Sequence, residues 1–312
     1  MCLISFSKTL EHEGNAKMKH FNGSPVWANI VITDGCSHKC VWCYGAFYEH
    51  NNIMTDSDFK SLSEKLLDMG IKQVTISGGE PMESPYFEKI IKLAFEKGFK
   101  VHVATHGEHI TEADLPLFLS YVDQVQFNFQ GSKRHDSVHK VKGSYTKQVN
   151  AIKILSDAGV KTVSMTTIGK YNVNDLDSIF SEADALGVSR IRMSDVNGRG
   201  LPWRKMDVQE LFDKATNSAN KLGYKYVHSY DPDYKGDTGV GCMYQENLFI
   251  DIKPNSVVKY CGTVQGEHDI VDLKTDVTAK EALKAIKEYN KNFACDTCAS
   301  RDYNDIQIEA VA

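Results

Sequence analysis

The arrangement of apolar and polar residues changes period repeatedly along the chain. Short apolar runs, which are typical of buried strands, alternate with longer segments in which apolar residues return every three or four positions, as in amphipathic helices. Three of the helical segments stop at a glycine, a common helix-stop residue: Gly98, Gly159 and Gly187. The predicted strands are 25–33, 71–77, 99–105, 122–129, 160–168 and 188–194, and the predicted helices between them are 55–69, 86–97, 112–121, 147–158 and 174–186.

Strands that alternate with helices predict an α/β fold with a parallel sheet and right-handed crossovers. A complete eight-unit barrel takes roughly 250 residues, whereas all six predicted strands fall within residues 25–194. The pattern therefore predicts a partial, six-unit TIM-like barrel. Its chemistry is expected at the C-terminal ends of the strands.

The segments on either side of the barrel have a different character. Residues 1–24 are mostly polar and are interpreted as an N-terminal extension or lid. Residues 25–205 are expected to form the barrel, and 206–312 a linker helix and a small C-terminal domain. That domain shows a helix at 208–222, a Tyr- and Asp-rich stretch at 224–237 interpreted as a connecting loop, a hairpin over 247–260 around Pro254-Asn255, and a helix at 279–289.

Composition narrows the class of protein. The chain has 312 residues, with 42% hydrophobic and 25% charged residues, which is ordinary for a soluble globular protein. A net charge of −5 gives no basic footprint for nucleic acid. No stretch approaches the ~20 apolar residues of a membrane span, and the N-terminal apolar core is too short for a secretory signal. Eight cysteines in metal-like spacings favour ligation in a reducing cytoplasm over disulfides.

Three cysteines follow the first predicted strand in the spacing C-x3-C-x2-C: Cys36, Cys40 and Cys43. Three thiolates this close can bind one face of a cubane iron–sulfur cluster and leave one iron with an open position. A zinc knuckle is the alternative, but it normally has a fourth Cys or His at matching spacing. His38 lies inside the loop, where it is poorly placed as a fourth ligand. The spacing favours the open cluster.

A second motif, Gly78-Gly79-Glu80, closes the strand at 71–77. Two glycines let backbone approach a ligand closely, and the carboxylate that follows can receive an ammonium group. One βα unit after the three-cysteine loop, this motif makes the chain resemble the radical S-adenosylmethionine (SAM) enzymes. The resemblance implies that the amino and carboxylate groups of SAM chelate the open iron, and that Gly78, Gly79 and Glu80 hold the amino group.

The resemblance also assigns the polar strand ends to SAM, although such residues are common in any α/β protein. It implies that the methionyl carboxylate, ribose and adenine contact Thr105, Asn128, Ser164 and Arg192, with Trp42 near the adenine. For Arg192 a surface ion pair is the alternative, and for Trp42 ordinary core packing. The candidates to face the substrate or accept a proton, among which the choice stays open, are Tyr44, His106, Arg192, Arg199 and Arg204.

A second set of cysteines surrounds the C-terminal hairpin and helix: Cys242, Cys261, Cys295 and Cys298. Four thiols complete the ligand set of a [4Fe–4S] cluster. Zinc also accepts four cysteines, usually from two close pairs, and here only one pair is close. A hairpin bracketed by cysteines, then a helix and C-x2-C, resembles the twitch domain, the smaller relative of the SPASM domain, and implies an auxiliary [4Fe–4S] cluster. Cys2 is left over.

The resemblance implies an enzyme in natural-product biosynthesis. A donor such as flavodoxin or ferredoxin would reduce the first cluster, SAM would yield a 5′-deoxyadenosyl radical, and that radical would abstract a substrate hydrogen. The auxiliary cluster would then take an electron from the substrate radical. The lead hypothesis is modification of a ribosomally made peptide by crosslinking, oxidation or epimerisation.

Three observations bear on the alternatives. Few residues precede the first strand, so a peptide-binding winged helix is not expected there, and this counts against a peptide. Gly262 rather than cysteine follows Cys261, which counts against epimerisation. Dehydrogenation or epimerisation of a small polyol or aminosugar is the second hypothesis. A non-enzymatic electron carrier or zinc scaffold is the third, but it leaves Gly78-Gly79-Glu80 unexplained.

Overall fold

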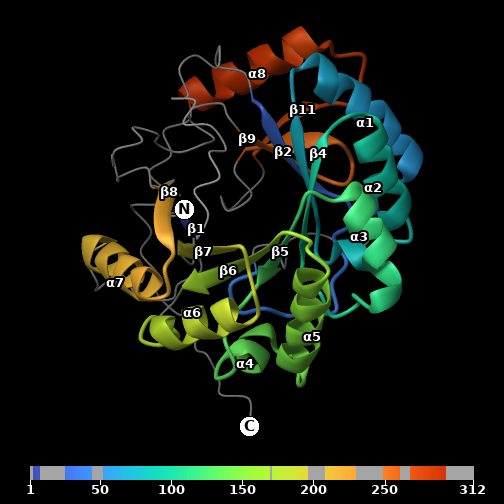
Figure 1. The fold of residues 1–312 in the computed structure, drawn as a ribbon. Helices are drawn as coiled ribbons and strands as arrows, with labels where there is room; N and C mark the ends of the chain where they lie inside the picture. Colours follow the sequence, from blue (N-terminus) through green and yellow to red (C-terminus); the bar gives the residue numbers. More distant parts are fainter. Residues whose placement is uncertain are drawn as a thin grey trace.

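A single mixed β-sheet runs through the whole computed structural model, which describes residues 3–7, 25–43, 52–168, 171–195, 208–229, 249–260 and 268–292. The strand order is β11-β10-β9-β2-β3-β4-β5-β6-β7-β1-β8. Figure 1 shows helices α1, α2, α3 and α5 along the outer side of this sheet.

Six parallel strands form the centre of the sheet, in sequence order and each paired with the next. This arrangement confirms the predicted partial barrel. The strands are β2 (Trp27–Val31), β3 (Gln73–Ser77), β4 (Lys100–Thr105), β5 (Gln124–Asn128), β6 (Thr162–Ile168) and β7 (Arg190–Asp195).

The helices between these strands lie close to their predicted positions. Thr55 and Asp58 form a capping box at the start of α1, which buries Phe59, Leu62 and Leu66. The predicted helix 112–121 is a 3-10 turn, η3, followed by α3, and the short α4 was not predicted because it has no apolar period. The elements are α1 (Asp56–Asp68), η2 (Pro81–Glu83), α2 (Phe87–Glu96), η3 (Glu112–Asp114), α3 (Leu115–Tyr121), α4 (His135–His139), α5 (Ser144–Asp157) and α6 (Leu176–Ala185).

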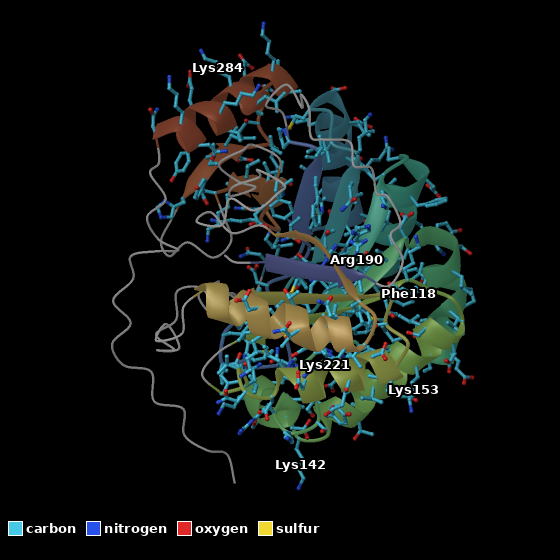
Figure 2. The ribbon with its side chains drawn as sticks, turned by 60° about the vertical axis from the view of Figure 1, so that its left-hand side comes forward. Phe118, Lys142, Lys153, Arg190, Lys221 and Lys284 are labelled. Carbon is cyan, nitrogen blue, oxygen red and sulfur yellow. The ribbon has the colours of Figure 1, made fainter. Side chains whose placement is uncertain are left out.

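The two faces of the sheet differ in chemistry because successive residues of a strand point to opposite sides. One face packs fully buried apolar residues against the helices, such as Ile76, Val103 and Phe127. The other face is buried but polar, with Asn29, Thr75, His102, Gln126 and Arg192. Figure 2 shows Arg190 of β7 within the sheet, while Lys142, Lys153 and Lys284 extend from the periphery. The polar face is where a polar ligand would find partners.

The N-terminus contributes a strand, in contrast to the predicted extension. Strand β1 (Leu3–Ser7) pairs antiparallel with β7 on one side and with β8 (Lys225–Ser229) on the other. A five-residue strand beside a polar run has too weak a periodic signal to be found. Strand β8 also falls in the Tyr- and Asp-rich stretch expected to be a loop, of which residues 230–237 lie outside the described residues. Helix α7 (Val208–Lys221) confirms the linker helix.

The C-terminal hairpin is present and continues the barrel sheet. Strands β9 (Phe249–Ile252) and β10 (Val257–Lys259) pair antiparallel, as predicted, and β11 (Asp269–Asp272) extends the hairpin. Strand β9 also pairs in parallel with β2, where Asn29 Nδ2 donates to Asp251 Oδ1 at 2.8 Å. Helix α8 (Ala279–Asn292) confirms the last predicted helix and lies near α1 in Figure 1.

Candidate active site

The three N-terminal cysteines lie on the loop that follows β2. Cys36, Cys40 and Cys43 are half-buried and form no disulfide. The backbone N–H of Cys43 donates to the Cys40 carbonyl at 3.0 Å, which closes a turn between them. Two further backbone bonds join the loop to α4: Lys39 N donates to His139 O at 3.2 Å and Val41 N to Val138 O at 3.0 Å. The loop is therefore fixed by the end of α4.

The glycine pair allows two loops to pack together. A Cβ atom on Gly79 would lie 2.1 Å from Gly35 O, and one on Gly78 would lie 2.6 Å from Thr33 O. Gly79 N donates to Thr33 O, and Glu80 N to Gly35 O, both at 2.8 Å. The close approach predicted toward a ligand is thus an approach to the residues that lead into the cysteine loop. Side chains are excluded here because backbone occupies the space.

The carboxylate of Glu80 is buried, 1% exposed, between the ends of β3 and β4. It accepts hydrogen bonds from Thr105 Oγ1 at 2.6 Å, from His106 N at 2.8 Å and from Met82 N at 3.0 Å. Burial raises its pKa to about 7, against the opposing effect of these three donors. Glu80 and Thr105, both predicted to contact SAM, are therefore bonded to each other, and their contact with SAM stays a prediction.

His38 cannot supply the fourth ligand of a cluster in this arrangement. Its Nε2 lies 2.7 Å from Glu108 Oε1 and its Nδ1 lies 3.0 Å from His139 Nδ1, so both nitrogens are engaged. Its ring stacks on His106 at 4.0 Å between centroids and 6° between planes. These contacts agree with the prediction that the loop histidine is no ligand.

His106 is unsuited to the predicted role of proton acceptor. Its Nδ1 already accepts the backbone N–H of Glu108 at 3.1 Å, and its ring is buried against His38. Burial, together with the neighbouring imidazole of His38, lowers the pKa of His106 to about 3. A buried, neutral ring with its acceptor nitrogen in use is a structural group at the end of β4.

Asn128 and Arg192 lie on the polar face of the sheet, in one row with Met165 between them. Asn128 Nδ2 donates to Thr167 Oγ1 at 3.0 Å, and Arg192 Nη1 donates to Gln126 Oε1 at 3.1 Å. Arg192 is only 6% exposed, which excludes the surface ion pair. Both positions suit a ligand on the polar face.

Ser164 is a correction. It is 1% exposed and pairs in register with Phe127 on one side and with Ile191 on the other, so it shares the helix-facing side of the sheet. A ligand on the polar face would contact its neighbours Met165 and Thr167 instead. Choosing the face of a fully buried strand requires the register, which residue type alone does not provide.

Aromatic rings surround the second half of the cysteine loop. Trp42 stacks on Tyr171, with 6.0 Å between centroids and 18° between planes, and meets His139 edge-on at 5.3 Å. Tyr171, His139 and Glu108 were not predicted, since loop positions carry no periodic signal; the i, i+4 spacing of His135 and His139 was the one available hint. The predicted residues outside the described part of the chain are Tyr44, Arg199, Arg204, Cys2, Cys242, Cys261, Cys295 and Cys298.

The donor set of the loop fits an iron–sulfur cluster. Burial, reinforced by the nearby carboxylates of Glu80 and Glu83, raises the pKa of Cys36 to about 12. Burial and the two neighbouring thiols also raise the pKa of Cys40 well above its ordinary value. Thiolates in such a place are stable only with a bound cation, which reverses the local electrostatics. Three soft sulfur donors on one loop are what an iron–sulfur cluster requires.

Residues 30–183 match the family model described as the radical SAM superfamily. The fold and the cysteine loop agree with this match, and this part of the chain forms a radical SAM domain. Domains of this class are enzymes that use SAM and a [4Fe–4S] cluster, and the residues above supply the ligands expected for both.

Several curated proteins resemble the chain. PqqA peptide cyclase of Gluconobacter oxydans (strain 621H) is 24% identical over 307 residues, covering 90% of this chain and 85% of that protein. PqqA peptide cyclase of Granulibacter bethesdensis is 23% identical over 252 residues, covering 76% and 67%. The antilisterial bacteriocin subtilosin biosynthesis protein AlbA of Bacillus subtilis (strain 168) is 27% identical over 183 residues; the match covers 56% of this chain and only 41% of that protein.

Solved structures share the fold. Streptococcus suis SuiB bound to its precursor peptide SuiA superposes with a TM-score of 0.70 at 15% identity, covering 87% of this chain and 67% of that one. The enzyme anSMEcpe with bound AdoMet gives 0.63 at 15% identity, covering 86% and 83%. In the described part of the chain, none of the helices has the length and apolar character needed to cross a membrane.

Proposed function

We propose that the chain is a radical SAM enzyme that modifies a ribosomally made peptide in natural-product biosynthesis. The observation that carries this proposal is the loop of three undisulfided thiols packed against Gly78-Gly79-Glu80 at the end of the parallel strands. The peptide substrate is supported by relatives named peptide cyclase and bacteriocin biosynthesis protein, and by the likeness to SuiB with its precursor peptide.

Cys36, Cys40 and Cys43 would hold a [4Fe–4S] cluster, with SAM at the open iron. Together these cofactors supply a 5′-deoxyadenosyl radical that takes a hydrogen atom from the substrate. The chain's own contribution is to place both ligands and to keep water away. The buried position of Glu80, together with the bonds from Gly79 and Glu80 to the loop, fixes the cysteines relative to β3 and β4.

The polar face of the sheet would orient SAM and substrate. Arg192 offers a guanidinium positioned by Gln126, and can pair bidentately with a carboxylate of SAM or of the substrate. Asn128 lies in the same row, and the ring of Trp42, stacked on Tyr171, is placed to pack against an adenine. Tyr44, which follows Cys43 directly, stays a candidate for contact with the substrate.

A second [4Fe–4S] cluster on Cys242, Cys261, Cys295 and Cys298 is part of the proposal. The hairpin of β9 and β10 supports it, since Cys261 comes one residue after the described end of that hairpin. A cluster with four thiolates has no open iron, so it suits electron transfer rather than SAM binding. A flavodoxin or ferredoxin would reduce the first cluster, and cysteine clusters of this kind fit a reducing cytoplasm.

The test is a reaction of anaerobically reconstituted enzyme with SAM, a reductant and the short peptides encoded beside its gene, followed by mass spectrometry. Loss of two hydrogens from a peptide is expected for crosslinking or oxidation, and uptake of deuterium from D2O for epimerisation. The matched control is the C36A/C40A/C43A variant, which should leave the peptide unchanged. Turnover of an aminosugar or polyol, with every peptide unchanged, would contradict the peptide assignment.

A further inference from the structure

Four buried histidines form a continuous chain of rings beside the cysteine loop. His135 stacks on His139 at 4.0 Å, His139 meets His38 edge-on at 5.2 Å and 84°, and His38 stacks on His106 at 4.0 Å. None of the four is more than 7% exposed. SAM cleavage as proposed above uses none of them. Their hydrogen bonds fix where the protons lie.

The first proton lies on His38 Nε2. This atom is 2.7 Å from Glu108 Oε1, while Lys147 Nζ donates to Glu108 Oε2 at 2.9 Å. Burial opposes ionisation of Glu108, but hydrogen bonds from Ser144 and Lys147 lower its pKa to about 2. An ionised carboxylate only accepts hydrogen bonds, so the proton between the two groups belongs to His38.

The second proton lies on His139 Nδ1. Only one proton fits between His38 Nδ1 and His139 Nδ1, which are 3.0 Å apart. If His38 supplied it, His38 would carry two protons and a positive charge at 5% exposure, which burial disfavours. The donor is therefore His139. The same nitrogen lies 3.6 Å from Cys40 Sγ, so its N–H is shared between the ring of His38 and the sulfur.

We infer that the Nδ1–H of His139 is a hydrogen-bond donor to the Cys40 sulfur and raises the reduction potential of the cluster that Cys36, Cys40 and Cys43 would hold. His38 and Glu108 act as positioning residues for this proton. Reduction adds negative charge to a cluster and its sulfurs, which an N–H donor stabilises, and hydrogen bonds to the sulfurs are among the factors that set cluster potentials. A ligating thiolate is also a stronger acceptor than a thiol.

The position of His139 is fixed by backbone as well as by rings. It is the last residue of α4, and Lys140 ends the helix in the left-handed conformation, with φ 60°. The carbonyl of His139 accepts from Lys39 N, and Trp42 packs edge-on against its ring. The donor therefore cannot leave Cys40 without displacing the loop.

A mononuclear metal ion is the competing arrangement. His38 and His106 cannot share one, because their stacked rings direct their lone pairs into parallel planes. His38, Cys40 and His139 bring their ligand atoms close enough together for an ion. Such an ion would remove Cys40 from the cluster and displace the proton from His139. Metal analysis of the reconstituted protein distinguishes the two arrangements.

The experiment is a redox titration of reconstituted full-length protein followed by EPR, using the signal that changes when SAM is added. H139F keeps a ring and removes the N–H, so the potential should fall by the equivalent of tenfold in the equilibrium constant, about 59 mV for one electron. H139N returns an N–H near the place of Nδ1 and should restore the wild-type potential. H135F removes a stacked ring that touches no sulfur and should change nothing.

The outcomes separate this inference from the proposed function on which it rests. Equal potentials for wild type and H139F, at equal iron content, overturn the inference and leave the function standing. One zinc per chain that H139F loses overturns it as well. A wild-type protein with no SAM-sensitive signal contradicts the proposed function itself. If H139F binds no iron, H139L against H139N makes the same comparison with smaller side chains.

Discussion

Single buried polar residues hold the parts of the candidate site together. Glu80 joins the ends of β3 and β4 through Thr105 and His106, and Glu108 joins His38 to Lys147. Each carboxylate is satisfied by donors from other segments of the chain, and satisfied buried polar groups specify a unique arrangement. At this scale the site is a set of hydrogen bonds whose strength depends on protonation.

Glu80 should make stability depend on pH in a particular direction. Its pKa is about 7 when folded, against 4.5 as the ordinary value, so between these pH values the folded state binds a proton that the unfolded state lacks. The free energy of unfolding therefore falls as pH rises through this window, by roughly 3 kcal/mol at 1.36 kcal/mol per unit. Glutamine does not titrate, so the E80Q apoprotein should lack this slope.

Urea unfolding at several values between pH 5 and pH 7.5 measures the effect. The comparison is between slopes, because E80Q also loses hydrogen bonds by an amount that does not depend on pH. Parallel curves for the two proteins would show that Glu80 is ionised throughout this range.

Ser256 offers a separate, local test in the hairpin of β9 and β10. It has φ 66°, in the left-handed region, and its buried Oγ has no hydrogen-bond partner among the described residues. Left-handed backbone costs an L-residue about 1–2 kcal/mol, and the added freedom of glycine in the unfolded chain offsets about half of this. S256G should stabilise the protein by about 1 kcal/mol in thermal unfolding. S256A, which removes the hydroxyl and keeps the strain, should gain less than S256G.

At the scale of elements, the site depends on close packing between two strand ends. The residues Thr33 to Gly35 after β2 and the Gly78-Gly79 pair after β3 are bonded backbone to backbone. The end of α4 supports the cysteine loop from another side. The cysteines are thus positioned by three elements, although they are close in sequence.

Gly79→Ala should disrupt this packing. The new Cβ would lie 2.1 Å from Gly35 O, so backbone must move, with an expected loss of about 3 kcal/mol in stability and a lower iron content after reconstitution. Gly35→Ala is the matched control, since its Cβ would meet only Thr33 Oγ1 at 3.4 Å. If the two variants bind equal amounts of iron, the glycine pair does not position the loop.

The six parallel strands were predictable because their apolar runs and the glycines that stop the helices are local signals. The cysteine loop was predictable from spacing alone. Other features depend on contacts between distant parts of the chain. Cys40 and His139 are 99 residues apart, and Asn29 and Asp251 are 222 apart, so neither contact leaves a local pattern. Ser164 was misplaced for the same reason, since its face depends on the pairing of three strands.

At the scale of the whole molecule, one sheet joins the barrel to the C-terminal hairpin. Strand β9 pairs with β2, the strand that leads into the cysteine loop, and Asn29 links Asp251 to Ser77 through buried hydrogen bonds. A change in the C-terminal part therefore acts directly on the strand beneath the candidate active site. This continuity is consistent with two clusters that work in one reaction.

Iron content tests the proposed number of clusters. Reconstituted wild-type protein should hold about eight irons per chain, four for each cubane. The C242A/C261A/C295A/C298A variant should hold about four and keep the SAM-sensitive EPR signal. Four irons together with one zinc in the wild type would remove the auxiliary cluster from the account.

The central claim is that Cys36, Cys40 and Cys43 support SAM cleavage, and the formation of 5′-deoxyadenosine and methionine by reduced, reconstituted protein tests it most directly. Wild type should form both products in equal amounts, whereas C36A/C40A/C43A should form neither while retaining about four irons in the second cluster. Undiminished cleavage by that variant, or none by a fully loaded wild type, would contradict the account.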